Sequence, residues 1–170
     1  MKIVFTGPES SGKTTLAEIL CQKYPFTLVR EFSREYMKKT GLNYDRQHVY
    51  EMGLLQLWEE KTTMKGHPLI CCDTDLQNIL LWQKVRYGSY DEHLLKMWLT
   101  SPGDHYFVCR PDIPWQPDSL RENPLDRGEL FDMHLELLNT YKMPYTVIEG
   151  NLEQRIAFVE SNPSLIHYRI

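Results

Sequence analysis

The sequence has few cysteines, no strong excess of either charge and no long hydrophobic run. Its four cysteines form no metal-ligand pattern: Cys71 and Cys72 are adjacent on an expected strand and point to opposite faces, while Cys21 and Cys109 lie in apolar stretches. We expect all four to be buried, reduced thiols. The 19 basic and 23 acidic residues give a net charge of −4, which argues against broad binding to nucleic acid or to a membrane surface.

The chain also lacks internal repeats, low-complexity tracts and any apolar stretch long enough for a membrane span or a secretory signal. Its first hydrophobic stretch is short and leads directly into a glycine-rich loop. The 170 residues, of which 42% are hydrophobic and 25% charged, suit one hydrophobic core and leave no room for two full domains. We therefore expect a single cytoplasmic domain over residues 1–170.

A phosphate-binding loop motif near the start of the chain is its most informative feature. The motif is Gly7-Pro8-Glu9-Ser10-Ser11-Gly12-Lys13-Thr14, followed by Thr15. The glycines let successive backbone N–H groups point at a polyphosphate, Lys13 places a positive charge near the β and γ phosphates, and the Thr14 hydroxyl can bind Mg²⁺. A helix that begins at this point adds its partial positive charge. Residues 7–15 are thus predicted to bind ATP.

Strand and helix patterns alternate along the chain. Strands are expected at 2–6, 26–30, 68–72, 105–109 and 145–148, and helices from 15 onward and at 31–37, 45–65, 76–86, 92–99, 129–142 and 152–160. Residues 110–127 contain four prolines and no apolar periodicity, which indicates a loop. The alternation predicts an α/β fold of the phosphate-loop NTPase type, a parallel five-stranded sheet with helices on both faces. The phosphate loop then lies at the edge formed by the strand ends.

Asp73 is the second chemical signal, because it ends an apolar strand as the metal-supporting acid of phosphate-loop proteins does. We predict that it supports Mg²⁺ together with Thr14. Strand-end aspartates also cap helices, and Thr74 or Asp75 is the alternative cap for the helix that follows. Asp75 is in addition a candidate for binding the acceptor.

Glu31 and Arg34 follow the second strand and lie at the same edge of the sheet. A carboxylate there can accept a hydroxyl proton or hold the sugar of an acceptor molecule. The alternative is an ordinary solvated helix start, since Glu31, Arg34 and Glu35 also stabilise a first turn.

The loop at 110–127 has the charges of a lid. Arg121 and Arg127 are placed to close over ATP, with Arg110 at the hinge, because phosphoryl transfer needs positive charge and the exclusion of water. Loop arginines are also commonly just solvated. Trp115, between prolines, is expected either to stack on a ligand or to fold inward, since an exposed aromatic ring is costly.

Four segments together resemble the ribosylnicotinamide kinase domain of bacterial NAD-biosynthesis regulators, the NadR-like family. They are residues 7–15, Arg30-Glu31-Phe32-Ser33-Arg34-Glu35-Tyr36, Asp73-Thr74-Asp75, and Pro114-Trp115 with Asp118 and Leu120-Arg121. The resemblance implies ATP- and Mg²⁺-dependent phosphorylation of the ribose 5′-hydroxyl of nicotinamide riboside. It further implies that Lys13 and Thr14 serve ATP and the metal and Asp73 is the metal-site acid. Trp115 would then lie near the pyridinium, and Arg121 would be the lid arginine.

The chain departs from that family in two respects. Its 170 residues start at the kinase motifs, so we expect neither the N-terminal adenylyltransferase domain nor the DNA-binding segment of longer members. Its lid carries Ser119 where glycine is expected. The cationic acceptor itself calls for carboxylates and aromatic faces. Residues that offer such groups are Glu31, Tyr36, Asp75, Asp112, Trp115 and Asp118.

Two other functions fit the same motifs. A kinase for another small acceptor, such as a deoxynucleoside or a vitamin precursor, would use the same loop and lid. A nucleotide-dependent regulatory switch is the alternative of another class. The segment Asn123-Pro124-Leu125-Asp126 is similar to a guanine-reading motif, but it lacks the lysine, and no Asp-x-x-Gly follows the third strand.

Overall fold

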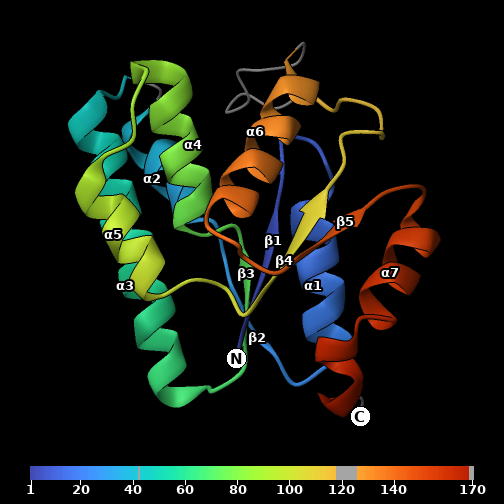
Figure 1. The fold of residues 1–170 in the computed structure, drawn as a ribbon. Coiled ribbons are helices and arrows are strands. Elements are labelled where there is room, and N and C mark those ends of the chain that lie inside the picture. Colours follow the sequence, from blue (N-terminus) through green and yellow to red (C-terminus); the bar gives the residue numbers. More distant parts are fainter. Residues whose placement is uncertain (42, 118–125, 169–170) are drawn as a thin grey trace.

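The computed structural model describes residues 1–41, 43–117 and 126–168. A parallel sheet lies at its centre, with helices on both faces (Figure 1). The elements in chain order are β1 (Lys2–Thr6), α1 (Lys13–Lys23), β2 (Thr27–Val29), α2 (Phe32–Thr40), α3 (Arg46–Gly66), β3 (Ile70–Asp73), α4 (Leu76–Tyr87), α5 (Glu92–Thr100), β4 (His105–Cys109), α6 (Arg127–Thr140), β5 (Tyr145–Ile148), α7 (Leu152–Glu160) and a terminal 3₁₀ helix, η1 (Pro163–Tyr168).

The five strands run in the order β2-β3-β1-β4-β5, and every neighbouring pair is parallel. All residues of β1, β3 and β4 are buried, as expected for strands covered on both faces. In the pairing of β1 with β3, Phe5 lies opposite Asp73. The end of β3 is therefore held beside the end of β1, from which the phosphate loop emerges.

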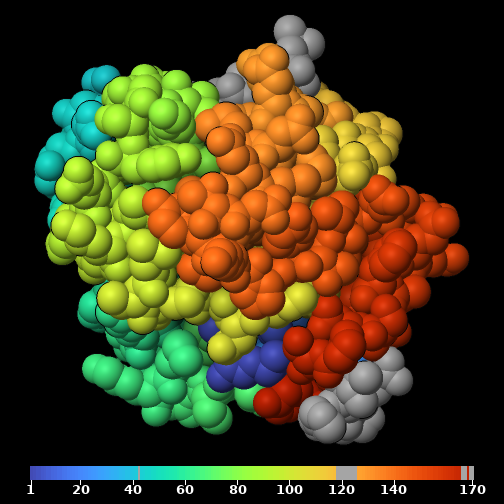
Figure 2. Space-filling view, in the orientation of Figure 1, coloured from blue at the N-terminus to red at the C-terminus, as the bar shows by residue number. Residues whose placement is uncertain are grey.

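Two hydrophobic cores fill the layers on either side of the sheet. Helices α2 to α6 contribute to one core, and α1, α7 and η1 to the other. In the space-filling view, α6 lies across the middle of one face, between α4 and α5 on its left and α7 on its right (Figure 2). Cys72 belongs to the first core and Cys71 to the second, so the adjacent cysteines do point to opposite faces. All four cysteines are free thiols, but Cys21 is half-buried and not fully buried as expected.

The strands and helices predicted from the pattern are all present, and their bounds differ by a few residues. The second strand is shorter than expected, the third begins at Ile70, and α6 begins at Arg127 instead of 129. The 3₁₀ helix after α7 was not anticipated. Asp45, at the start of the helix expected over 45–65, caps α3, because its carboxylate accepts a hydrogen bond from the His48 N–H at 3.0 Å.

No helix in the described part of the chain is both long and apolar enough to cross a membrane.

Candidate functional site

The phosphate loop has a backbone that only a few residue types adopt easily. Gly7 and Gly12 have φ angles of 130° and 88°, and Ser10 has a φ of 54°. A Cβ atom on Gly7 would lie 2.6 Å from the carbonyl oxygen of Cys109 at the end of β4, closer than any real Cβ contact. Glycine at position 7 therefore serves both the turn and the close packing of the loop on β4.

The charged and hydroxyl groups of the loop are held at the start of α1. The Lys13 Nζ donates a hydrogen bond to the Pro8 carbonyl at 2.8 Å across the loop. The Thr14 hydroxyl donates to Oδ2 of Asp73 at 2.6 Å. The phosphate loop and the end of β3 are thereby joined through two side chains that were predicted as a metal pair.

The Thr14–Asp73 pair fits a magnesium ion. Oδ1 of Asp73 is buried and has no hydrogen-bond partner among the residues described, and such an orphaned buried oxygen calls for a partner of its own. The described residues contain no group of three or more His, Cys, Asp or Glu side chains that could hold a metal ion. Proteins bind Mg²⁺ through one or two side chains together with water and substrate phosphates, and Thr14 and Asp73 are two such side chains.

Glu31 lies close to the phosphate loop, in the segment that connects β2 to α2. It is half-buried and accepts a hydrogen bond from the Ser33 hydroxyl at 2.7 Å. Burial, and then the neighbouring Asp73 carboxylate, raise the pKa of Glu31, while the charges of Lys13 and Arg34 oppose the rise. Burial likewise raises the pKa of Asp73, against its Thr14 hydrogen bond and the Lys13 charge. A carboxylate with a raised pKa is a better proton acceptor near neutral pH.

The phosphate loop, Glu31 and Arg34 line one cavity of about 260 Å³. It lies outside the carboxyl ends of the strands, where open α/β sheets bind their ligands. The residues that line it are Gly7, Pro8, Glu9, Ser10, Ser11, Gly12, Lys13, Thr14 and Thr15 of the loop, Glu31, Arg34 and Met37, then Asn78, Leu81, Trp82 and Val85 of α4, then Ile113 and Gln116, and Leu130 and His134 of α6. The predicted phosphate-loop residues, Glu31 and Arg34 are thus brought together.

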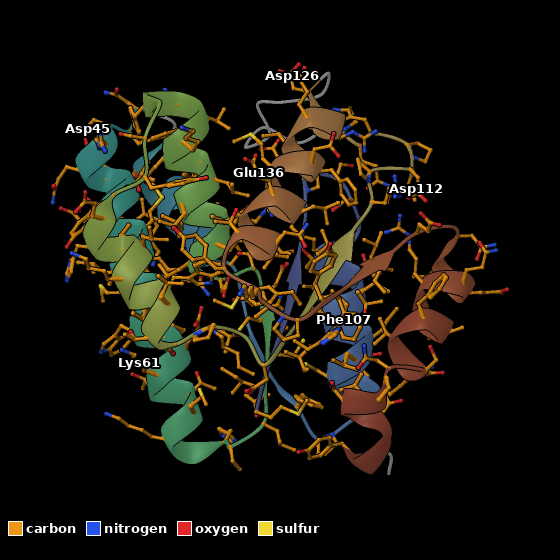
Figure 3. All side chains as sticks on the ribbon, viewed as in Figure 1. Asp45, Lys61, Phe107, Asp112, Asp126 and Glu136 are labelled. Atoms are coloured by element: carbon orange, nitrogen blue, oxygen red, sulfur yellow. The ribbon has the colours of Figure 1, made fainter. Side chains whose placement is uncertain are left out.

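Two predicted acceptor-binding carboxylates make their contacts away from the cavity. Asp75 is 1% exposed, and one oxygen of its carboxylate caps α4 by accepting a hydrogen bond from the Gln77 N–H. The other oxygen accepts hydrogen bonds from the Tyr106 hydroxyl at 2.8 Å and the Trp98 indole N–H at 3.3 Å. It also lies 3.5 Å from the Lys2 ammonium. Capping of this helix was the alternative role that the sequence suggested for Asp75. Asp112 lies beside the loop that leads into α7 (Figure 3) and accepts hydrogen bonds from the Gly150 N–H at 2.6 Å and from Arg155.

Tyr36 is also outside the cavity lining and packs against the core on the α2–α3 side. In the lid region, Arg127 donates hydrogen bonds to the carbonyls of Ser10 at 3.3 Å and Ile113 at 3.1 Å. Its guanidinium carbon lies 5.7 Å from the centre of the Trp115 ring, which is half-buried and does not line the cavity. Asp118 and Arg121 lie outside the described residues.

Arg155 was missed by the sequence reasoning, although it supports the loop. Its guanidinium is buried and donates to the carbonyls of Ser11 (2.7 Å), Gly150 (2.7 Å) and Arg110 (2.9 Å), and it pairs with Asp112. One side chain of α7 therefore ties the phosphate loop to the segments after β4 and β5. A single arginine in the helix predicted over 152–160 gives no local signal for this role.

His134 was missed for the same reason. It is 3% exposed, and its Nδ1 lies 3.1 Å from the Thr6 hydroxyl and 3.4 Å from Oε1 of Gln77. Burial, with the charge of nearby Lys13 as a second cause, lowers the pKa of His134 to about 3. A neutral imidazole therefore lines the cavity beside the phosphate loop at physiological pH.

Comparison with solved structures shows which fold this is. A NadR protein in complex with NAD and AMP-PNP superposes with a TM-score of 0.81 at 16% identity, over 99% of this chain and 50% of that one. A deoxyadenosine kinase from M. mycoides gives 0.66 at 16%, over 98% of this chain and 100% of that one. A thymidylate kinase from Ehrlichia chaffeensis gives 0.64 at 17%, over 94% and 97%. The predicted phosphate-loop fold of the nucleoside-kinase type is confirmed.

At these identities the likeness extends to the fold and no further. No curated protein matches the sequence. Residues 2–155 match the AAA_28 family, described as an AAA domain, and the chain belongs to this family.

Proposed function

We propose that the protein is an ATP- and Mg²⁺-dependent kinase that phosphorylates the ribose 5′-hydroxyl of nicotinamide riboside to give nicotinamide mononucleotide. One observation carries the proposal: the phosphate loop, the Thr14–Asp73 pair and the Glu31 carboxylate line or adjoin a single cavity. That cavity continues beyond the loop between α2, α4 and α6, which leaves space for an acceptor next to the transferred phosphate.

Each group has a distinct task in this reaction. The loop N–H groups and the start of α1 hold the phosphates of ATP, and Lys13 balances their negative charge. Thr14 and Asp73 would hold Mg²⁺, which would supply positive charge to offset the negative charge that develops during transfer. Glu31 accepts the proton of the acceptor hydroxyl, for which its raised pKa suits it. Arg127, and in our proposal Arg121, close the lid over the nucleotide.

Two features favour nicotinamide riboside as the acceptor. The segment Arg30–Tyr36 resembles the NadR-like family, and the positively charged ring of this nucleoside suits the groups that line the cavity. Carboxylates and aromatic faces stabilise a fixed cation, and the cavity is lined by both kinds of group, with Glu31 near the loop and Trp82 on α4. The similarity in fold to a NadR protein in complex with NR agrees with this choice (TM-score 0.74, 15% identity, 99% of this chain and 50% of that one). Trp115 and Asp118 remain predicted contacts of the acceptor.

A deoxynucleoside is the second candidate acceptor. The deoxyadenosine kinase that shares the fold is matched over its whole length, and the loop, metal pair and carboxylate would serve any nucleoside hydroxyl equally well. A nucleotide-dependent regulator is the alternative outside the kinases, and it requires no acceptor.

The test is a phosphorylation assay with ATP, Mg²⁺ and a panel of nucleosides, with the products identified by mass. We expect nicotinamide riboside to be phosphorylated, and Lys13→Ala to lower the rate by about 10²–10³-fold in a folded protein, because a group that stabilises transferred charge is lost. Turnover of another nucleoside alone would contradict the acceptor assignment. ATP consumption that no acceptor increases would contradict the kinase function itself.

A further inference from the structure

One face of α4 forms a wall of the cavity that no sequence motif indicated. Asn78, Leu81, Trp82 and Val85 all line the cavity, and their spacing of three, four and seven residues places them on one side of the helix. The helix begins just after Asp73, so Asn78 is the member nearest to the metal pair. From Asn78 to Val85 the helix advances by about 10 Å, at 1.5 Å per residue.

The wall changes in character along this length. The end near Asp73 has polar neighbours, namely Glu31, Arg34 and Asn78, whereas Trp82 and Val85 face the cavity together with Met37 of α2 and Leu130 of α6. A molecule that places a hydroxyl group at the phosphate loop would therefore extend from a polar region into an apolar one. A nucleoside has this same order, with a ribose hydroxyl at one end and a planar ring at the other.

Trp82 packs against a second aromatic residue that does not line the cavity, Tyr44. Its ring meets that of Tyr44 edge to face, with centroids 5.0 Å apart and an interplanar angle of 82°. Tyr44 is itself buried, and the guanidinium carbon of Arg86 lies 4.5 Å from the centre of its ring. Trp82 remains half-buried at the cavity. A ligand that packs against this indole thus meets a ring whose orientation is already fixed, which reduces the entropy lost on binding.

Asn78 supplies a free polar group on the same wall. Its side-chain amide forms no hydrogen bond with any residue that the structure describes, although its backbone N–H pairs with the Asp75 carbonyl at 3.1 Å as part of the helix start. An amide that lines a cavity without a protein partner is available for the hydroxyl groups or ring substituents of a ligand.

We infer that the acceptor is recognised by this face of α4, with its planar ring against Trp82 and a hydrogen bond to Asn78. The inference rests on the proposed kinase function and deepens it, because it names the residues that bind the planar ring of the acceptor. It also assigns the main aromatic contact to Trp82, whereas Trp115 already has the Arg127 guanidinium near its ring.

The experiment compares Trp82→Leu, Trp82→Phe and Asn78→Ala with a matched control, Trp58→Leu. Trp58 lies on α3, is 61% exposed and does not line the cavity. Steady-state kinetics are measured with the best acceptor of the nucleoside panel, and the dissociation constant of that nucleoside alone is measured by calorimetry. Thermal unfolding identifies any variant that has lost its fold.

We expect Trp82→Leu to raise the KM and Kd of the nucleoside by about 5- to 150-fold, the loss typical of a base–aromatic stack. Trp82→Phe retains most of the affinity, and Asn78→Ala raises the KM by about 2- to 10-fold through loss of one neutral hydrogen bond. The KM for ATP stays unchanged in all of them, and Trp58→Leu behaves as the wild type.

Equal nucleoside affinities in Trp58→Leu, Asn78→Ala and a folded Trp82→Leu would overturn the inference and leave the kinase function intact. If Trp82→Leu does not fold, Asn78→Ala decides the result, and an unchanged nucleoside affinity in that variant overturns the inference. A wild-type protein that neither binds nor phosphorylates any nucleoside would instead overturn the proposed function, and the inference with it.

Discussion

The contacts of Arg155 allow its contribution to stability to be worked out from the structure. Arg155→Met removes a buried guanidinium that satisfies three backbone carbonyls and the Asp112 carboxylate. Asp112 is partly exposed and keeps its hydrogen bond from the Gly150 N–H, so most of the cost comes from the three carbonyls that lose a donor, at a net of about 1–1.5 kcal/mol each. For a chain of this length, each kcal/mol lowers Tm by about 2–4 °C. We therefore expect the free energy of unfolding to fall by about 3–5 kcal/mol and Tm by about 6–20 °C.

The same substitution is expected to affect nucleotide binding, because the Ser11 carbonyl belongs to the phosphate loop. Without its guanidinium partner the loop is less well ordered before ATP arrives, so the KM for ATP rises more than kcat falls. Urea unfolding and steady-state kinetics measure the two effects. Lys23→Met is the control, since the Lys23–Glu160 pair is exposed and worth about 0–1 kcal/mol. An Arg155→Met protein as stable as this control would refute the reasoning.

Three further substitutions test the loop and the carboxylates. Asp73→Asn should shift the Mg²⁺ dependence of kcat to higher Mg²⁺ concentrations and lower kcat by about 10²–10³-fold. The affinity for AMP-PNP measured in EDTA, without metal, should change little. An unchanged Mg²⁺ dependence would leave Asp73 with a structural role only. Glu31→Gln should abolish the acidic limb of the kcat/KM profile. Because the folded-state pKa of Glu31 is raised, its ionised form destabilises the fold at neutral pH, and this penalty is relieved as pH falls through that pKa. Glu31→Gln should therefore raise Tm at pH 7 while activity falls, and a lower Tm would contradict this. Gly7→Ala should destabilise the protein by at least about 1–3 kcal/mol, because its Cβ meets the Cys109 carbonyl at a positive φ, whereas Gly66→Ala, which has open space around it, should be neutral or stabilising.

The order of strands and helices, and much of the phosphate site, followed from the sequence because their signals are local. The cap of α3 at Asp45, the helix stops at Gly41 and Gly88, and the loop at 7–15 each depend on residues within a few positions of one another. The place of Asp73 beside the loop was also predictable. Parallel strands bring their carboxyl ends to one edge of a sheet, and β3 pairs directly with β1.

Only the tertiary structure decided which polar side chains face the cavity. Asp75 and Asp112 carry the right chemistry for a cationic acceptor, but Trp98 and Tyr106 bind the first, and Arg155 binds the second. These partners lie 23 to 43 residues away, and Arg155 reaches Ser11 across 144 residues. A pattern of neighbouring residues does not encode such pairings.

The cavity face of α4 is a second feature that the sequence alone does not predict. Its apolar periodicity predicts a helix, yet Leu80 of that helix is buried in the core while Trp82 lines the cavity. A helix packed on a sheet has neighbours on more than one side, and the hydrophobic effect acts on apolar surface without regard to what covers it. The sequence thus determined that α4 is an apolar helix after Asp73. The packing of α2 and α6 around it decided which of its side chains meet a ligand.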